Sequence, residues 1–416
     1  MKRHLAPIAA LLVSVSILLT GQGLQGTLLP VRATLENFPT LAIGAMGTAY
    51  FLGFTLGCLK GGELIGKVGH VRVFLAMTAL ASAAPLIHGL VISQWAWSVL
   101  RLLTGFCLAA IYIVIESWLN ERSTNANRGF IFSSYAMITL TVLAIGQMMT
   151  LLYEPSGLQL FAIASVLVSI AAIPIALSSS PSPAVPQKVR VDLKRLFAIS
   201  PAGTLGCLAT GLANGAFWAL AAVFAQKASG NVTLAAWFMT SAVIGGAIAQ
   251  WPLGMASDWL GRRAVFIGVS LAAAIIGIAL VYLSPGASFI WMNILAAGWG
   301  MMAFPLYSIS VAHVNDHAEP AEYVTVSSGL LLMYGIGATV GPFVASALMS
   351  LTEFTGLFLY SGLIHFALAI IAAVRAASRR GVIVADPVSF SSALAAAQTA
   401  SQVYEENIQQ DSTDNK

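Results

Sequence analysis

Long apolar runs separated by short polar stretches fill most of the 416 residues. A helix that crosses a bilayer needs about 20 mainly apolar residues, because each residue adds about 1.5 Å toward a hydrocarbon depth of about 30 Å. Hydrophobic residues make up 58% of the chain and charged residues only 9%, a balance that excludes a soluble globular protein. We therefore predict an all-α membrane protein with twelve transmembrane helices, at about residues 5–29, 40–60, 71–92, 95–118, 129–152, 158–178, 201–226, 234–256, 264–283, 287–312, 325–349 and 354–375.

A stretch rich in proline and serine, at 178–186, divides these runs into two groups of six. Proline lacks a backbone donor and cannot continue a helix, so the stretch is typical of a linker. We predict a six-helix bundle at 1–178, a cytoplasmic linker at 179–199 and a second six-helix bundle at 200–378. The polar end of the chain, 379–416, is expected to be a disordered cytoplasmic tail.

The connection between the eighth and ninth runs carries a charged motif with a weaker copy earlier in the chain. Gly254 to Arg263 reads GMASDWLGRR, and Gly62 to His70, 192 residues earlier, reads GELIGKVGH. A single offset, with no gap, also aligns Gly21-Gln22-Gly23 with Ala213-Asn214-Gly215, Gly53 with Gly245, Gly69 with Gly261, and Arg101 with Asn293. Such agreement indicates an internal repeat, and transporters built from repeats bind their substrates near the bilayer midplane between the two halves.

Lysine and arginine are unevenly distributed along the predicted spans. If the amino terminus is cytoplasmic, 17 of the 20 lie on the cytoplasmic side, while Arg32 and Lys227 lie opposite and Arg101 lies inside the membrane. Cytoplasmic loops of membrane proteins are enriched in these residues, so we expect both termini to be cytoplasmic. One predicted cytoplasmic loop, 313–322, departs from the pattern because it holds acidic residues but no lysine or arginine.

The motif Gly254-x-x-x-Asp258-x-x-Gly261-Arg262-Arg263 resembles the signature cytoplasmic loop of the major facilitator superfamily, abbreviated MFS, which follows the second helix of each six-helix half. The sequence RLLTG at 101–105 is similar to the fourth-helix motif of that family. Further stretches, at 116–120, 250–254, 304–308 and 313–316, resemble a bacterial branch called YcaD-like. The resemblance covers about residues 5–378. It implies two pseudo-symmetric six-helix bundles and a secondary transporter that moves a small solute by alternating access.

Polar side chains inside the apolar runs are the candidate substrate ligands: Gln22, Gln25, Arg101, Asn214 and Asn293. Amides both donate and accept hydrogen bonds, and a guanidinium favours a carboxylate or phosphate by charge and fork geometry. Together these residues predict a solute with an anionic group. The alternative is that backbone carbonyls or bound water hold Arg101, which then only shapes the bundle.

Proton coupling would require ionisable groups within the membrane. Arg101 is a candidate through the resemblance of its motif to one implicated in proton coupling, and Glu116 is the only carboxylate well within the fourth run. We do not expect these two residues to pair, because fifteen residues of helix separate them by about 22 Å. A structural salt bridge of Glu116 at the gate, and transport without protons, are the open alternatives.

The two loop copies are the candidate gate, formed by Gly62, Gly69, Gly254, Asp258, Gly261, Arg262 and Arg263. The resemblance implies that Asp258 stabilises the closed cytoplasmic gate by meeting the positive amino terminus of a helix in the other half. We expect this role to be structural. The first copy departs from the family pattern because Gly66 stands where an aspartate is usual.

The sequence gives no indication of catalysis or of a cofactor. Gly61 to Lys67 fits part of a phosphate-binding loop, but Val68 replaces the required serine or threonine and the segment follows an apolar helix. We expect no enzyme activity, no cofactor or metal, and no nucleic-acid partner. The expected partners are a small-molecule substrate, the lipid bilayer and, if transport is coupled, protons. We expect a monomeric multi-pass protein of the inner membrane, with a non-transporting sensor or accessory protein of the same fold as the alternative.

Overall fold

A computed structural model describes residues 2–121, 123, 128–177, 183, 192–319 and 322–378. Every regular element in these residues is a helix. The long helices of the first half are α1 (Lys2–Leu35), α2 (Thr40–Val68), α3 (His70–Leu90), α4 (Gln94–Glu121), α5 (Arg128–Met148) and α6 (Gln159–Ile170), with the short η1 (Met149–Leu151) and α7 (Ala172–Ala176). The rest of the chain forms α8 (Leu193–Ile199), α9 (Pro201–Ser229), α10 (Val232–Trp259), α11 (Arg262–Leu283), α12 (Phe289–Ala303), α13 (Leu306–Asn315), α14 (Tyr323–Thr352), η3 (Glu353–Thr355) and α15 (Gly356–Ser378).

These helices supply the predicted membrane spans. By length and composition, eleven stretches of the described chain could cross a membrane, and the last of them, Thr325–Arg375, contains both α14 and α15. The tenth predicted span is divided into α12 and α13 at Pro305, where the ring removes a backbone donor. The helix α8 lies within the predicted linker, while the other predicted linker residues, apart from 183 and 192, and the predicted tail lie outside the described residues.

The surface of the bundle carries large apolar and aromatic side chains. Trp95 at the start of α4, Tyr282 at the end of α11 and Trp259 at the end of α10 are among the most exposed. Tryptophan and tyrosine are enriched where membrane helices pass from hydrocarbon to head groups, because their rings combine an apolar body with a polar group. The exposed side chains therefore fit a lipid-facing surface bounded by aromatic residues.

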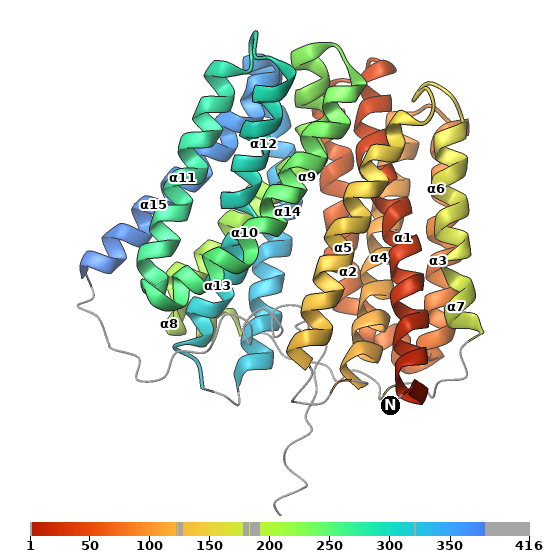
Figure 1. Ribbon diagram of the computed structural model, residues 1–416, viewed down its shortest axis with the longest axis horizontal. Coiled ribbons are helices and arrows are strands. Elements are labelled where there is room, and N and C mark those ends of the chain that lie inside the picture. Colours follow the sequence, from red (N-terminus) through yellow and green to blue (C-terminus); the bar gives the residue numbers. More distant parts are fainter. Residues whose placement is uncertain are drawn as a thin grey trace, which may run out of the picture.

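Figure 1 shows the helices as two bundles, α1 to α7 and α9 to α15. We call the end at which α2 meets α3 and α10 meets α11 the loop-motif end, and the opposite end the far end. In the figure the loop-motif end is at the bottom, where the amino terminus is marked. The two connections at this end turn alike, because Gly69 and Gly261 have φ values of 92° and 86°. Residues with a β-carbon rarely adopt such angles, so glycine is favoured at both copies.

Helix packing within each bundle repeats at the same offset. A β-carbon at Gly53 on α2 would collide with the carbonyl oxygen of Leu102 on α4, and one at Gly245 on α10 would collide with that of Ala297 on α12. Glycine permits this close approach of membrane helices. The sequence repeat thus corresponds to a repeated contact between the second and fourth spans of each half.

The two halves meet through hydrogen bonds toward the far end. Thr48 on α2 donates to the carbonyl of Thr339 on α14 at 2.8 Å. Lys227 at the end of α9 donates to Thr40 at 2.8 Å, and the hydroxyl of Thr240 on α10 lies 3.2 Å from the amide oxygen of Gln147 on α5. Apart from Thr339, which is near the middle of α14, these residues lie toward the far end of their helices, so the contacts hold the halves together between the middle and the far end.

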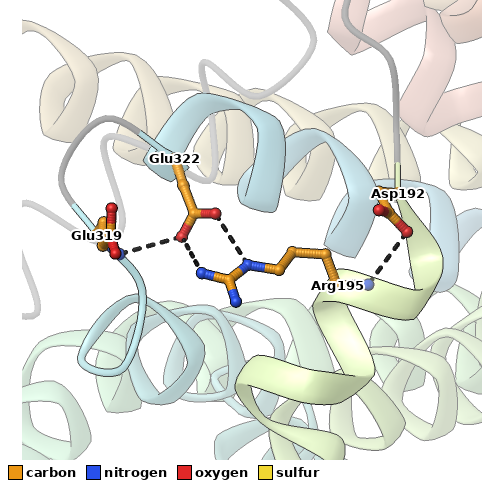
Figure 2. A network of polar contacts seen from close by, with 4 residues as sticks. All are labelled: Asp192, Arg195, Glu319 and Glu322. Atoms are coloured by element: carbon orange, nitrogen blue, oxygen red, sulfur yellow. Dashed lines mark hydrogen bonds and ion pairs between the residues drawn. The ribbon is translucent and has the colours of Figure 1, made fainter.

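At the loop-motif end of the second half, the acidic loop at 313–322, which holds no lysine or arginine, contacts other segments. Figure 2 shows Arg195 on α8 donating two hydrogen bonds, of 2.9 and 3.0 Å, to the carboxylate of Glu322 before α14. Arg195 also donates its backbone N–H to Asp192 at 3.1 Å, which caps α8. Two of the three acids in this loop thus pair with basic residues from other segments, Glu322 with Arg195 and Asp316 with Arg262.

Candidate functional site

Three side chains from three helices form a cluster in the first half. The amide of Gln22 on α1 donates to the hydroxyl of Tyr50 on α2 at 3.4 Å. The guanidinium carbon of Arg101 on α4 lies 4.0 Å from the centroid of the Tyr50 ring. A cation over an aromatic face is stabilised by the ring quadrupole. Tyr50 therefore connects two of the predicted substrate ligands, which the sequence places 79 residues apart.

The charge of Arg101 is not neutralised by a carboxylate. In the part of the chain that the structure describes, Arg101 takes part in no ion pair, and its Nη1 atom is buried with no hydrogen-bond partner. An unpaired charge within a membrane span is costly, so such residues usually face a partner or a water-filled space. The arrangement leaves donors of Arg101 available to an anionic group.

A second cluster, from α9, α13 and α14, lies in the other half. Asn214 on α9 interacts with the hydroxyl of Tyr334 on α14. The rings of Tyr334 and Tyr307 on α13 meet edge to face with centroids 5.0 Å apart. The Oδ1 atom of Asn214 and the hydroxyl of Tyr307 are buried without hydrogen-bond partners in the described part of the chain. Each half therefore contributes an amide beside a tyrosine.

The two clusters lie within electrostatic range of each other across the interface between the halves. Tyr50 of the first half lies within electrostatic range of Tyr334 of the second, and Glu116 on α4 lies within that range of Tyr307. Glu116 is also in range of Tyr112 on the same helix. The structure thus brings the predicted coupling residue Glu116 to the same interface, and it shows no ion pair between Glu116 and Arg101.

The remaining predicted ligands are placed differently. Gln25 on α1 is buried, and its Nε2 atom has no partner in the described residues. Asn293 on α12 uses its amide within its own half, because it donates to the carbonyl of Phe289 at 2.8 Å and accepts from Ser241 on α10 at 3.1 Å. Asn293 is therefore already hydrogen-bonded, whereas its counterpart Arg101 is not.

The charged motif forms a buried ion-pair cluster in the second half. Arg262, whose side chain is only 5% exposed, pairs with Asp258 at 3.0 Å and with Asp316 at the end of α13. It also donates to the hydroxyl of Ser257 at 3.1 Å. Arg262 thus joins the α10–α11 connection to the tenth span, and Asp258 pairs within its own half, while the gating contact that the resemblance implies stays a prediction.

The aligned positions of the first half that the structure describes, His70 and Gly66, carry no such ion pair. His70, which aligns with Arg262, is buried and lies against Trp118 on α4 with ring centroids 6.4 Å apart. Gly66, which aligns with Asp258, is exposed. Of the other predicted gating residues, Gly254 is buried, Gly62 is half-buried and Gly261 is exposed. The loop copies therefore share their turn but differ in the contacts that fix them.

Sequence reasoning missed the tyrosines of the site, namely Tyr50, Tyr112, Tyr307 and Tyr334. Within an apolar run, tyrosine is equally typical of a helix core or of the membrane interface, and the repeat gives no further signal because Tyr50 aligns with Ala242. A metal centre is not suggested either, since the described residues contain no group of three or more metal-binding side chains.

Comparison with known proteins decides the family. The family model described as Major Facilitator Superfamily matches residues 11–203 and again residues 203–391. The chain belongs to the Major Facilitator Superfamily. The two matches divide the chain near the start of α9, so each six-helix half matches the same model. The protein is a multi-pass membrane protein of a transporter family.

Curated relatives confirm the resemblance to the YcaD-like branch. An uncharacterized MFS-type transporter of Enterobacter sp. (strain 638) is 26% identical over 351 residues, which is 84% of this chain and 90% of the relative. The uncharacterized MFS-type transporter YcaD of Salmonella typhimurium is 25% identical over 352 residues, with the same coverage. YcaD of Escherichia fergusonii is 26% identical over 351 residues, again covering 84% and 90%.

Solved structures with a similar fold are also transporters. A mutant of the nucleoside transporter NupG matches with a TM-score of 0.76 at 15% identity, covering 88% of this chain and 99% of that chain. A bacterial homologue of the human lysosomal transporter Spinster, described as inward-facing and unoccupied, gives 0.69 at 13%, covering 97% and 99%. The E. coli fucose:proton symporter FucP gives 0.57 at 14%, covering 90% and 99%. These identities show the fold alone, and they confirm the predicted two-bundle architecture.

Proposed function

We propose that this membrane transporter is a secondary transporter of a small solute with an anionic group, which binds between the halves at Arg101. The observation that carries the proposal is the guanidinium of Arg101, which lies over Tyr50 and has a buried Nη1 atom without a partner. A carboxylate or phosphate of the solute would accept the hydrogen bonds that Arg101 leaves unmade. Gln22 and Asn214 would orient the rest of the solute.

The tyrosines support binding of the uncharged part of the solute. Tyr50, Tyr307 and Tyr334 offer ring faces and hydroxyl groups from both halves. A solute that contacts both clusters would bind more tightly when the halves approach around it. This is the differential affinity that a ligand needs to shift a conformational equilibrium, and therefore to drive alternating access.

We propose further that the loop-motif end is cytoplasmic and that the membrane is the inner membrane. The excess of lysine and arginine at this end supports the orientation. With the halves hydrogen-bonded toward the far end, the arrangement is then closed to the outside and the site is reached from the cytoplasm. We also propose that the first bundle ends at residue 178, the linker at 199 and the second bundle at 378. The proposed transporting unit is a monomer.

We propose that proton coupling takes place through Glu116. Arg101 is the second coupling residue, because the environment of its charge changes as the solute binds. Glu116 lies within electrostatic range of Tyr307 in the other half, so its electrostatic surroundings would change when the halves move. Uptake by a proton-coupled carrier should depend on an imposed pH gradient. In Glu116→Gln this dependence should disappear while solute binding remains, whereas an uncoupled uniporter would show no gradient dependence in the wild type.

The binding proposal is tested by thermal-shift screening with matched pairs of carboxylates or phosphates and their uncharged analogues. A ligand that binds only the folded state raises its apparent stability. We expect stabilisation by an anionic member and not by its uncharged partner. Arg101→Gln should weaken binding of the anionic solute by about 1.5–3 kcal/mol, the range for hydrogen bonds to charged groups. Asn293→Ala is the control, because Asn293 is hydrogen-bonded within its own half.

Two results would contradict this proposal. Equal binding of the anionic solute to the wild type and to Arg101→Gln would remove the arginine from the site. Binding without any movement of the solute across proteoliposome membranes, in either direction and with any imposed gradient, would favour the alternative of a sensor or accessory protein with the transporter fold.

A further inference from the structure

A second polar site lies at the loop-motif end of the second half, away from Arg101. It is a cavity of about 40 Å³ between α9, α11, α13 and α15, and its polar lining consists of Ser200, Arg263, His313, His317 and Arg375. A buried water requires about 10–15 Å³ of such space, so the cavity has room for a small polyatomic group. Among the described residues, its lining side chains include four basic residues and no acidic one.

The charges of this cavity are not neutralised within the described residues. Arg263 and Arg375 take part in no ion pair there. His313 is 8% exposed, its ring has no hydrogen-bond partner there, and Arg263 and His317 lie within electrostatic range of it. Arg263 is half-buried and Arg375 exposed, so water screens part of their repulsion, but positive groups gathered around a buried imidazole favour an anion between them.

The adjacent arginines of the loop motif have opposite environments. Arg262 is buried against Asp258 and Asp316, so its charge is balanced by protein carboxylates. Arg263 lines the cavity instead, where the lining provides no carboxylate. The difference indicates that Arg262 is structural, whereas Arg263 is available to a ligand.

The amino terminus of α9 adds to the positive potential. This helix begins at Pro201 and is 29 residues long, with Ser200 as its N-cap. The first N–H groups of a helix and its dipole favour negative charge at this position. The ring of His313, which packs edge to face on that of His317 with centroids 5.1 Å apart and has no hydrogen-bond partner among the described residues, points to a ligand independently of the dipole, as do the two arginines without ion pairs there.

The cavity also lies at a membrane boundary. The candidate spans of α9 and α11 begin at Pro201 and Arg262, and those of α13 and α15 end at Asn315 and Arg375. All four helices thus leave the hydrocarbon region around the cavity, which is the level of lipid head groups.

The sequence repeat does not reproduce the lining residues of this cavity in the first half. At the offset of 192 residues, Arg263 aligns with Val71 and His313 with Glu121. The basic lining is therefore a property of the second half of this chain, and the pseudo-symmetric fold does not require it.

From these observations we propose that the cavity binds a phosphate group, carried either by an anionic lipid head group or by a free phosphate, through Arg263, Arg375 and His317. Arginine forks match phosphate oxygens bidentately, and the helix amino terminus supplies a further donor. The proposal is independent of the solute site, because no residue of the cavity belongs to the clusters around Arg101.

The test uses the full chain purified with endogenous lipid removed. Native mass spectrometry measures phosphatidylglycerol and phosphatidylcholine retained after equilibration, and thermal shift measures the effect of inorganic phosphate. We expect retention of phosphatidylglycerol in preference to phosphatidylcholine. The double variant Arg263→Gln with Arg375→Gln should weaken retention by about tenfold or more, a factor that corresponds to one lost charge-assisted hydrogen bond.

Arg72→Gln is the matched control, because Arg72 is an exposed arginine at the same end of the other half, outside the cavity. It should retain phosphatidylglycerol as the wild type does. If inorganic phosphate stabilises the wild type and the double variant loses this effect, the site binds a free phosphate. If phosphatidylglycerol is retained but inorganic phosphate gives no stabilisation, the site binds a lipid head group. His317→Gln replaces the double variant if that protein does not fold.

The proposal is overturned if the wild type neither retains phosphatidylglycerol preferentially nor responds to phosphate. It is equally overturned if the single variants Arg263→Gln and Arg375→Gln each lose no more lipid than Arg72→Gln, because the binding would then follow net charge.

Discussion

At the scale of single residues, burial separates charges that stabilise the fold from charges that are available for binding. Arg262 and Asp316 have side chains 5% and 6% exposed and are paired with each other, whereas Arg101 has a buried nitrogen without a partner. Removing one member of a buried pair leaves the other charge uncompensated. The same arginine chemistry therefore serves structure at one place and, in our proposal, binding at another.

The first prediction concerns the two aspartates that pair with Arg262. Asp316→Asn should destabilise the protein by about 1–3 kcal/mol, because it removes the most buried partner of Arg262 and leaves buried donors that Asp258 alone does not satisfy. Asp258→Asn should cost only about 0–1 kcal/mol, since the side chain of Asp258 is 36% exposed and water screens the pair. Denaturant unfolding of the two variants in the same detergent checks the order, and an equal or reversed cost would contradict it.

At the scale of helices, close packing between α2 and α4 positions the cluster around Arg101. Gly53 and Gly105 each lie where a β-carbon would collide with a carbonyl oxygen of the opposite helix, that of Leu102 or of Tyr50. The second collision is with the backbone of the tyrosine that contacts Arg101. Small residues on these helices therefore determine where the site residues stand.

A second prediction follows from this packing. Gly105→Ala should destabilise the protein by about 1–3 kcal/mol, as overpacking does, and should weaken solute binding by displacing Tyr50. Gly26→Ala on α1 is the control, because no atom lies within 4 Å of a β-carbon there. It should be neutral or stabilising by up to about 1 kcal/mol. If both variants behave alike in unfolding and binding, packing does not position the site.

A third prediction concerns the contact between α8 and α14. Hydrogen bonds from Arg195 lower the pKa of the Glu322 carboxyl. The contact is therefore complete at neutral pH, persists below the ordinary glutamate pKa of about 4.3, and is lost as the pH falls through the lowered pKa. A spin label at Phe197 on α8 should gain mobility only at those acidic values. In Glu322→Gln it should already be mobile at neutral pH, and an immobile label in that variant would contradict the role of the pair.

Much of the helix arrangement was predictable because it follows from local properties of the sequence. Long apolar runs located the spans, and the shared offset located Gly69 and Gly261, which adopt the same backbone turn. Contacts between distant segments were not predictable. Arg262 and Asp316 are 54 residues apart, and only the absence of lysine and arginine from the loop around Asp316 suggested that its partner lies elsewhere.

The candidate site was predictable only in part. Gln22, Arg101 and Asn214 were found because polar groups are rare inside apolar runs. Tyr50 and Tyr334 were missed because their importance depends on which helix face meets the other half. Asn293 was included by symmetry with Arg101, but symmetry of position does not determine whether an amide is already hydrogen-bonded.

At the scale of the whole molecule, a fourth prediction concerns orientation. Single cysteines at Asn37, between α1 and α2, and at Ala264, in the first turn of α11, lie at opposite ends of the bundle. In a background with Cys58, Cys107 and Cys207 replaced, an impermeant reagent added outside intact cells should label the first and not the second. Labelling at Ala264 would reverse the proposed orientation.

The two halves must also move around the proposed site if the protein works by alternating access. They are hydrogen-bonded toward the far end, for example between Lys227 and Thr40. Binding of a solute by residues from both halves should favour a state in which the loop-motif end closes and these contacts are released. The movement should therefore depend on Arg101.

The most direct test is a pair of distance measurements between spin labels on α2 and α14, with the anionic solute that the screen identifies. One pair, at Val68 and Thr325, reports on the loop-motif end, and the other, at Leu41 and Leu351, reports on the far end. We predict that saturating solute shortens the first distance and lengthens the second, and that Arg101→Gln abolishes both changes at the same concentration. Bound solute that leaves both distances unchanged in the wild type, or that changes them equally in Arg101→Gln, would contradict the account.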